Sequence, residues 1–196
     1  MITYSKIKRL REVPTFTVND LADIFGIRQE SASVLCSRYV KEGIFIRLKR
    51  NFYILDERWE HSSKEDILRI SNFLQVPSYI SFMTALSLYE VTTQVQRGIF
   101  ESACIRHSIS YNIRLKRFNY YKLDKRYYSH FIKDRDIFIA SKEKAFIDSI
   151  YLYSLGRYSI DINSLNIDKL ERDKIEEIVK IFPPKTQRII KRLCRI

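Results

Sequence analysis

The sequence predicts an α+β protein: a small helical domain that ends in a β-hairpin, then a mixed α+β domain, then a helical C-terminal tail. Three observations lead to this prediction. Two short amphipathic helical patterns precede a pair of apolar runs over residues 44–55. Residues 64–158 alternate helical stripes with runs rich in β-branched and aromatic side chains. The composition, 45% hydrophobic and 30% charged, is typical of a chain that folds.

The first domain, residues 1–56, is recognised by the start and stop signals of its helices. A short helix is expected over residues 5–11. The next helix starts after Thr17, which stands three residues before Asp20 in the spacing of an N-cap, although that position more often carries Glu or Gln. Gly26 ends this helix, because glycine accepts the left-handed conformation that a helix end requires.

A third helix is expected over residues 28–42 and is ended by Gly43. Two short strands with a polar turn between them follow, over residues 44–48 and 52–55. Two short helices separated by a glycine turn and followed by a hairpin make the winged helix-turn-helix arrangement, in which the second helix of the pair can enter the major groove of DNA. The apolar residues that share one face of this helix are Ala32, Leu35, Cys36, Tyr39 and Val40.

The rest of the chain divides into a linker, a second domain and a tail. The polar run of residues 57–63 is predicted as the linker, and its Trp59 is expected to pack against one of the two domains. The mixed α+β domain covers residues 64–158 and the helical C-terminal extension residues 159–196. Helices are expected from about Ser63 and over residues 80–89, 141–155, 168–181 and 185–195, and strands over residues 102–106, 113–122 and 137–140.

Charge indicates the class of partner. The net charge of +12 and pI of about 9.6 attract polyanions, of which nucleic acid is the first candidate. No apolar stretch approaches the roughly 20 residues that cross a bilayer, and the N-terminus lacks the apolar core of a signal peptide, so we expect a cytoplasmic protein without a membrane partner. Its three cysteines are far apart and form no C-x-x-C pair, which indicates packing residues.

The outward face of the helix over residues 28–42 carries side chains of the sizes that read base edges or hold phosphates. Val34 on this face can touch a thymine methyl group, and Glu30 is an acidic exception. Any amphipathic surface helix shows polar residues outward, but the hairpin tip adds cations where a wing would meet the DNA backbone. The predicted DNA-binding residues are Arg28, Gln29, Ser31, Ser33, Ser37, Arg38, Arg47, Lys49 and Arg50.

A second run of cations is interleaved with aromatic residues between Arg114 and Tyr128. Rings stack on bases and cations neutralise phosphates, so this run suits a second nucleic-acid surface. It equally suits one basic face of a sheet whose other face is core, and an RNA-binding or protein-binding adaptor stays open as an alternative function. The residues of this second basic surface are Arg114, Lys116, Arg117 and Lys122.

Other chemistry finds little support in the sequence. The four glycines are too widely spaced for a phosphate-binding G-x-x-x-x-G-K-[ST] or G-x-G-x-x-G loop. The three histidines are isolated from one another and from cysteine. Carboxylates at strand and helix boundaries are usually caps or solvated surface; those considered for an acidic metal site are Asp134, Asp136, Glu143 and Asp148. We therefore expect no metal, no cofactor and no enzymatic activity, with a metal-dependent nucleic-acid enzyme as the least favoured alternative.

Three segments resemble the AbiEi family, the antitoxins and transcriptional regulators of type IV toxin-antitoxin systems. FTVNDLADIFGIRQESASVLCSRYVKEGIFIRLKRNFYIL looks like the family's N-terminal domain, and PSYISFMTALSLYEV and IFIASKEKAFIDSIYL look like two signatures of its second domain. Together they cover most of residues 15–155. The helix-turn-helix segment is common to many regulators. The two segments of the second domain are therefore the ones that distinguish this family from other regulators.

The resemblance implies a transcriptional repressor that binds inverted repeats of double-stranded DNA in its own promoter. It also implies a functional partner, a toxin of nucleotidyltransferase type, which the second domain opposes without needing to bind it. The family often has glycine in the wing turn where this chain has Asn51, and asparagine is the next best residue for a positive φ. The tail after about Tyr158 has no counterpart in the resemblance.

Overall fold

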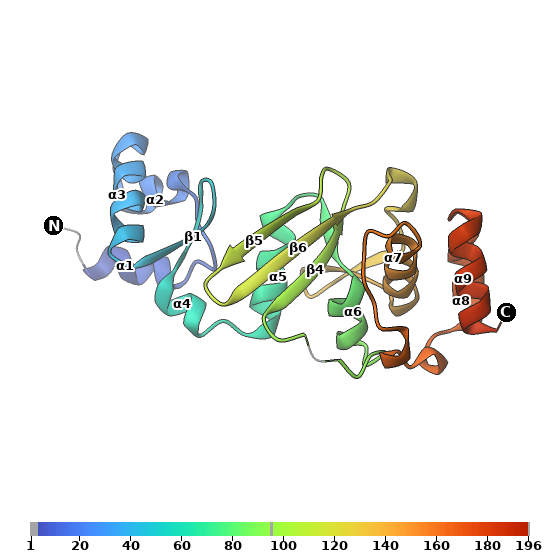
Figure 1. Cartoon of the computed structure of the whole chain (residues 1–196). Coiled ribbons are helices and arrows are strands. Elements are labelled where there is room, and N and C mark those ends of the chain that lie inside the picture. Colours follow the sequence, from blue (N-terminus) through green and yellow to red (C-terminus); the bar gives the residue numbers. More distant parts are fainter. Residues whose placement is uncertain (1–3, 95, 196) are drawn as a thin grey trace. The chain divides into compact units, whose positions relative to one another are not determined.

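The computed structural model describes residues 4–94 and 96–195 and has a mixed α+β fold (Figure 1). This confirms the α+β class that the sequence predicts: the described residues form nine α-helices and two β-sheets. The chain divides into two compact units, Met1–Ile70 and Ser71–Ile196, and the division falls inside helix α5 (Lys64–Leu74). The other elements of the first unit are α1 (Tyr4–Arg11), α2 (Val18–Phe25), α3 (Gln29–Lys41), β1 (Phe45–Lys49), β2 (Phe52–Leu55) and α4 (Asp56–Glu60).

Helix α2 begins and ends where the sequence signals place it. The hydroxyl of Thr17 accepts a hydrogen bond from the backbone N–H of Asp20 at 3.2 Å, and the Asp20 carboxylate accepts one from the N–H of Thr17 at 2.7 Å. This is a capping box in which aspartate occupies the position that more often holds glutamate or glutamine. At the other end Gly26 adopts φ +62°, the left-handed conformation expected of it.

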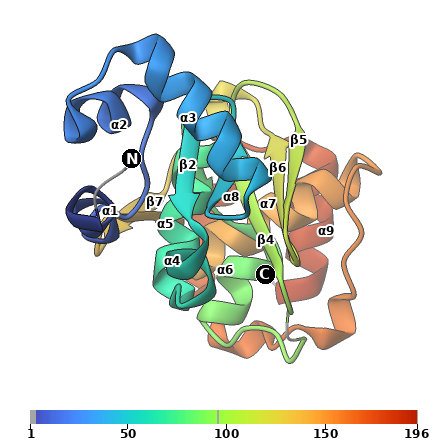
Figure 2. The same cartoon turned by 90° about the vertical axis from the view of Figure 1, so that its left-hand side faces the viewer.

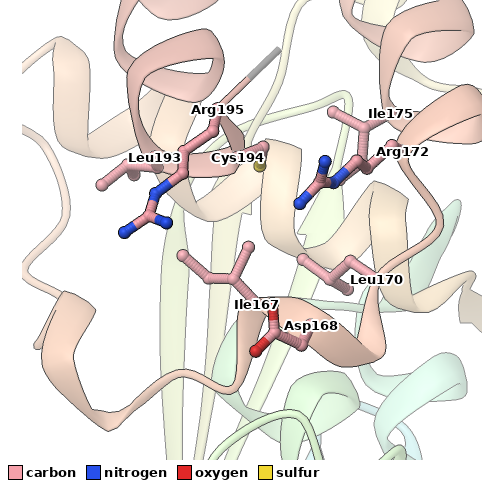
Figure 3. A pocket seen from close by; sticks show the side chains of 8 residues that line it. All are labelled: Ile167, Asp168, Leu170, Arg172, Ile175, Leu193, Cys194 and Arg195. Atoms are coloured by element: carbon pink, nitrogen blue, oxygen red, sulfur yellow. The ribbon is translucent and has the colours of Figure 1, made fainter.

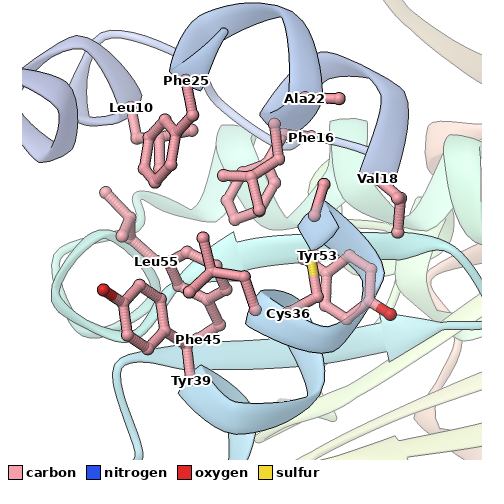
Figure 4. Close-up of a cluster of buried hydrophobic side chains, with 13 residues drawn as sticks. Leu10, Phe16, Val18, Ala22, Phe25, Cys36, Tyr39, Phe45, Tyr53 and Leu55 are labelled. Atoms are coloured by element: carbon pink, nitrogen blue, oxygen red, sulfur yellow. The ribbon is translucent and has the colours of Figure 1, made fainter. Parts of the chain in front are cut away.

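The core of the first unit lies among α1, α2, α3 and the hairpin, and five of its thirteen buried residues are aromatic (Figure 4). Phe45 packs edge-on against Phe16 and Tyr39, with ring centroids 4.9 and 5.0 Å apart. Phe16 and Tyr53 exchange two backbone hydrogen bonds of 2.9 and 2.8 Å, so the segment before α2 pairs with the outer strand of the hairpin. These contacts hold α2 and α3 on the hairpin, and the helices can be followed from a second side in Figure 2.

The segment predicted as a linker contains a helix. Residues 56–60 form α4, which packs against β1 and β2, and its Trp59 is 2% exposed. Arg58 donates to the carbonyl of Arg11 at 2.9 Å, and Arg11 forms an exposed ion pair with Glu57. The start of the predicted linker is thus fixed to the first unit by burial of the indole ring.

The second unit is built on a mixed six-stranded sheet of order β5-β6-β4-β3-β8-β7. The pairs β3–β4, β5–β6 and β7–β8 are antiparallel, whereas β3–β8 and β4–β6 are parallel. The strands are β3 (Ser78–Ile80), β4 (Ile99–Cys104), β5 (Ile109–Ile113), β6 (Lys116–Lys122), β7 (Phe131–Asp134) and β8 (Ile137–Ala140). The helices after α5 are α6 (Phe82–Leu88), α7 (Lys142–Ser154), α8 (Arg172–Val179) and α9 (Pro184–Cys194), with short 3-10 turns at Lys125–Tyr127, Ile162–Ser164 and Ile167–Lys169.

The C-terminal extension packs on α7 within the second unit (Figure 1). The hydroxyls of Ser154 on α7 and Thr186 on α9 lie 3.0 Å apart, and both residues are buried. Phe182, between α8 and α9, stacks on Tyr127 with ring centroids 4.4 Å apart. The predicted helices of the tail are present, but the first begins four residues later than expected, at Arg172, because residues 167–169 form a 3-10 turn.

A buried polar network joins α7 to the centre of the sheet. Lys144 and Asp148 lie one helical turn apart on α7, are fully buried and form an ion pair. The Asp148 carboxylate also accepts hydrogen bonds from the hydroxyls of Tyr79, at 2.8 Å, and Ser81, at 2.9 Å. Burial raises the pKa of Asp148 and lowers that of Lys144, while the charge of each partner opposes the shift of the other.

Several strands of the second unit differ from the prediction. Edge strands β5 and β7 were not predicted, and the strand expected over residues 113–122 is the turn after β5 followed by β6. The helix expected over residues 80–89 begins at Phe82, because residues 78–80 form the central strand β3. Strand β3 is buried on both faces, so its residues show no alternation that separates a short strand from a helix start.

All three cysteines are buried and unpaired. Cys36 lies on the core face of α3, and Cys104 and Cys194 lie in the second unit. Burial raises the pKa of Cys36 and of Cys194 to about 11, and it also raises the pKa of Cys104. Each thiol is therefore protonated at neutral pH.

Candidate nucleic-acid interface

Helix α3 separates a buried face from an exposed one. Ala32, Leu35, Cys36 and Tyr39 are buried in the core of the first unit, as the apolar pattern predicts, whereas Val40 is half-buried. On the opposite face Val34 is 71% exposed. Serines and charged residues surround it. The serine side chains on this face are short, so the helix backbone beside them can come close to a partner.

A hollow of about 670 Å³ lies between α3 and the β1–β2 hairpin. It brings together polar side chains from both elements, and five of the predicted DNA-binding residues contribute to it. Arg47 and Arg50 face it from the hairpin, and Glu30 is its acidic member. The residues that line it are Val18, Gln29, Glu30, Ser33, Ser37, Arg47, Arg50, Asn51 and Tyr53.

The other predicted residues lie around this hollow. Ser31 and Arg38 line a shallow depression on the far side of Val34. Arg28 is the exposed N-cap residue of α3. Lys49 is half-buried, and its ammonium lies 5.4 Å from the centre of the Phe52 ring. The structure thus groups Gln29, Ser33, Ser37, Arg47 and Arg50, and leaves the other four at the margins.

Hydrogen bonds inside α3 limit what its exposed side chains can offer. The hydroxyl of Ser37 donates to the carbonyl of Ser33 at 3.1 Å, so its oxygen is available mainly as an acceptor. The guanidinium of Arg38 lies 3.7 Å from the Glu42 carboxylate, and both side chains are about half exposed. Such an exposed pair is weak enough to exchange its partner for a phosphate.

Four residues that line the hollow were not among the predicted DNA-binding residues: Val18, Glu30, Asn51 and Tyr53. Asn51 adopts φ +56° in the hairpin turn, and its side-chain oxygen accepts a hydrogen bond from the backbone N–H of Val18 at 2.9 Å. This bond ties the hairpin tip to the first residue of α2. Tyr53 contributes a phenol whose pKa is raised by burial, while the charge of Arg47 opposes that shift. Two of the four stood out in the sequence: Glu30 as the acidic residue of this helix face, and Asn51 as a residue suited to positive φ.

The second basic surface is not one patch. Successive residues of a strand point to opposite faces of its sheet, so Lys116 and Lys122 share the side of buried Phe118 on β6, and Arg117 points to the other side. The Arg117 guanidinium donates to the Asn119 side chain at 3.1 Å. Arg114 lies in the turn after β5, with φ +52°.

The four carboxylates considered for a metal site have separate roles. Asp148 is paired with Lys144 in the core. Buried Glu143 accepts a hydrogen bond from the N–H of Glu171 at 3.1 Å, and Asp136 pairs with Lys133 at 2.8 Å. Asp134 is exposed at the end of β7. Over residues 4–94 and 96–195, no cluster of three or more potential metal-binding side chains forms.

Comparison of the sequence with models of known protein families gives no match, and comparison with curated proteins gives none. None of the helices in the described part of the chain is long and apolar enough to cross a membrane.

Proposed function

We propose that the first unit is a winged helix-turn-helix that binds double-stranded DNA, with α3 as the recognition helix and the β1–β2 hairpin as the wing. The observation that carries the proposal is the hollow between them, where polar residues of α3 and cations of the hairpin face the same space. The major groove admits a helix whose outer face is exposed, and a basic wing beside it reaches the phosphate backbone.

The start of α3 suits binding to phosphate, and the residues that follow suit contacts with base edges. No side chain caps the start of α3, so the N–H groups of its first turn are available to a phosphate oxygen. Farther along, Gln29 and Ser33 offer hydrogen-bonding groups to base edges, and Val34 offers an apolar contact. Glu30 carries a negative charge into the hollow and can accept a hydrogen bond from a cytosine amino group.

The test is a binding titration with the DNA upstream of the protein's own gene, against unrelated DNA of equal length, at several salt concentrations. We expect Gln29→Ala to weaken upstream binding by about 1–3 kcal/mol and to reduce discrimination between the two DNAs. Arg50→Ala removes a phosphate contact, so it lowers the slope of log affinity against log salt by about 0.9.

Lys180→Ala, at an exposed position after α8, removes one charge far along the chain and serves as the matched control. Equal affinity for both DNAs with a salt slope that none of the variants changes would refute recognition by this face.

We further propose, on the resemblance to the AbiEi family, that the protein represses its own operon through inverted repeats and acts as the antitoxin of a nucleotidyltransferase toxin. The test is co-expression with a nucleotidyltransferase encoded beside its gene. Growth arrest by that enzyme, relieved by this protein and by its Gln29→Ala variant, is the expected result. Growth arrest that persists with the protein present would refute the antitoxin role and leave DNA binding to its own test.

A further inference from the structure

The hairpin formed by β5 and β6 in the second unit ends in a turn of two residues, Arg114 and Leu115 (Figure 1). Two-residue hairpin turns usually hold glycine, asparagine or aspartate, because these residues accept positive φ. Here Arg114 adopts φ +52°, and Leu115 is 97% exposed. Turn formation therefore does not explain why an arginine and a leucine stand at this tip.

Close backbone contacts hold the tip in place. The backbone N–H of Arg117 donates to the carbonyl of Gly98 at 2.7 Å, and a Cβ at Gly98 would lie 2.8 Å from the carbonyl oxygen of Leu115. The last residue of β5, Ile113, is buried and pairs with Lys116 across the turn. A partner that covers Leu115 therefore gains an apolar contact without having to order the backbone that carries it.

The charged side chains of this hairpin are all cationic. Residues 102–123, which include both strands and the turn, contain no carboxylate. Successive residues of a strand point to opposite faces, so Lys116 and Arg117 lie on opposite sides of the hairpin. The depression at the ends of α8 and α9 differs, because its two arginines share it with Asp168 (Figure 3). The β5–β6 tip thus joins one exposed apolar side chain to an uninterrupted positive charge.

The cations of this tip repeat those of the hairpin proposed as the wing. The sequence Arg-Leu-Lys-Arg stands at residues 47–50 and again at residues 114–117, and isoleucine precedes it in both places. In the wing, Leu48 belongs to strand β1 and is buried, because the turn there falls later in the repeat. The two hairpins therefore share their cations, but of the two leucines only Leu115 faces solvent.

We propose that the β5–β6 tip enters the minor groove of double-stranded DNA, with Leu115 inserted as a wedge between two base pairs. Lys116 and Arg117 then face the phosphates on the two sides of the groove, whose charge they neutralise. Apolar side chains that enter the minor groove unstack a base step and bend the duplex by about 20–90°. This inference rests on the proposed function for its class of partner, but it adds a contact from the unit Ser71–Ile196 that α3 does not make.

Fluorescence energy transfer between dyes on the two ends of a short duplex with a flexible central TA step measures bending by the full chain. We expect the protein to raise the transfer. Leu115→Ala should return it to the value of free DNA, whereas Leu115→Phe, which keeps an apolar wedge, should preserve it. Leu155→Ala removes a leucine from another exposed position, at the end of α7, and serves as the matched control. Bound DNA that stays straight, or a bend that Leu115→Ala leaves unchanged, would overturn the proposal.

The same measurement on the upstream and the unrelated DNA separates this contact from recognition by α3. Discrimination between the two DNAs without a bend would refute the wedge and leave the proposed function intact. An equal bend in both DNAs without discrimination would support the wedge and refute recognition by α3. Arg117→Gln should lower the slope of log affinity against log salt by about 0.9.

Anionic phospholipid vesicles provide the competing partner, because an exposed leucine among cations also suits a membrane surface. Vesicles of phosphatidylserine and phosphatidylcholine should not bind the protein through this tip. Vesicle binding that Leu115→Ala abolishes, with DNA left straight, would overturn the proposal and assign the tip to a lipid surface.

Discussion

Replacing Lys144 by methionine tests the buried network of the second unit. The side chain of Lys144 is fully buried, and its ammonium neutralises Asp148, which is also fully buried. Methionine fills a similar volume but leaves the carboxylate without a counter-charge. Removing one partner of a buried pair costs about 3–5 kcal/mol. We expect the Lys144→Met variant to lose that much free energy of unfolding at pH 8, where Asp148 would have to stay ionised in the core.

The loss should depend on pH in a defined direction. Burial already raises the pKa of Asp148, and the Lys144 charge is the largest effect that opposes this rise, so the variant's folded-state pKa lies higher still. A group whose folded pKa is raised stabilises the fold below its unfolded pKa and loses that contribution as pH rises through the folded value. The penalty should therefore be smaller at pH 5 than at pH 8, changing by at most about 1.4 kcal/mol per pH unit.

Urea unfolding followed by circular dichroism at pH 5 and pH 8 measures both effects. The double variant Lys144→Met with Asp148→Asn should recover most of the loss, because an amide oxygen still accepts from the hydroxyls of Tyr79 and Ser81 without carrying charge. Lys180→Met, at an exposed site, should stay within about 0.5 kcal/mol of the natural protein. A Lys144→Met penalty below about 1 kcal/mol, or one independent of pH, would refute the assignment of an ionised buried pair.

Three further predictions concern the hairpin, α3 and a close backbone approach. Asn51→Ala should cost about 1–2 kcal/mol, because alanine loses the bond to Val18 and tolerates positive φ less well than asparagine. Asn51→Gly also loses that bond but adopts positive φ without strain, so it should stay closer to the natural stability; equal urea midpoints for the two variants would contradict this. If Val34 packs on a thymine methyl group as proposed, deoxyuridine at that position should weaken DNA binding about fourfold, the value of one buried methyl group. Val34→Ala should abolish that difference in a titration. Gly98→Ala should destabilise the second unit by more than about 1 kcal/mol, because Gly98 has φ +70° and a Cβ there would lie 2.8 Å from the Leu115 carbonyl oxygen. An unchanged melting temperature would contradict this and show that the β5–β6 turn moves to make room for the methyl group.

Local chemical signals made much of the fold predictable. Thr17 with Asp20 predicted the start of α2, and Gly26 predicted its end. Ser141 predicted the start of α7, where its hydroxyl accepts a hydrogen bond from the N–H of Lys144 at 3.1 Å. Each such signal involves residues within four positions of one another. The buried side of α3 followed in the same way from its helical period.

Features that depend on distant residues were not predictable. Edge strand β7 was missed because Phe131–Asp134 is short, polar at one end and paired only on one side. The bond between Asn51 and Val18 joins residues 33 positions apart, so no local pattern indicates it. The sequence suggested which residues of α3 and the hairpin point outward, but their shared hollow depends on tertiary packing.

The three buried thiols can report when the core around each of them opens transiently. A thiolate, not a thiol, reacts with alkylating reagents, and each cysteine is shielded by burial and held in the protonated form. Alkylation therefore proceeds only while the surrounding core is transiently open. Mass spectrometry of the labelled peptides would measure the rate of alkylation at Cys36 for the first unit, and at Cys104 and Cys194 for the second. These rates report the local opening of each unit without any engineered probe.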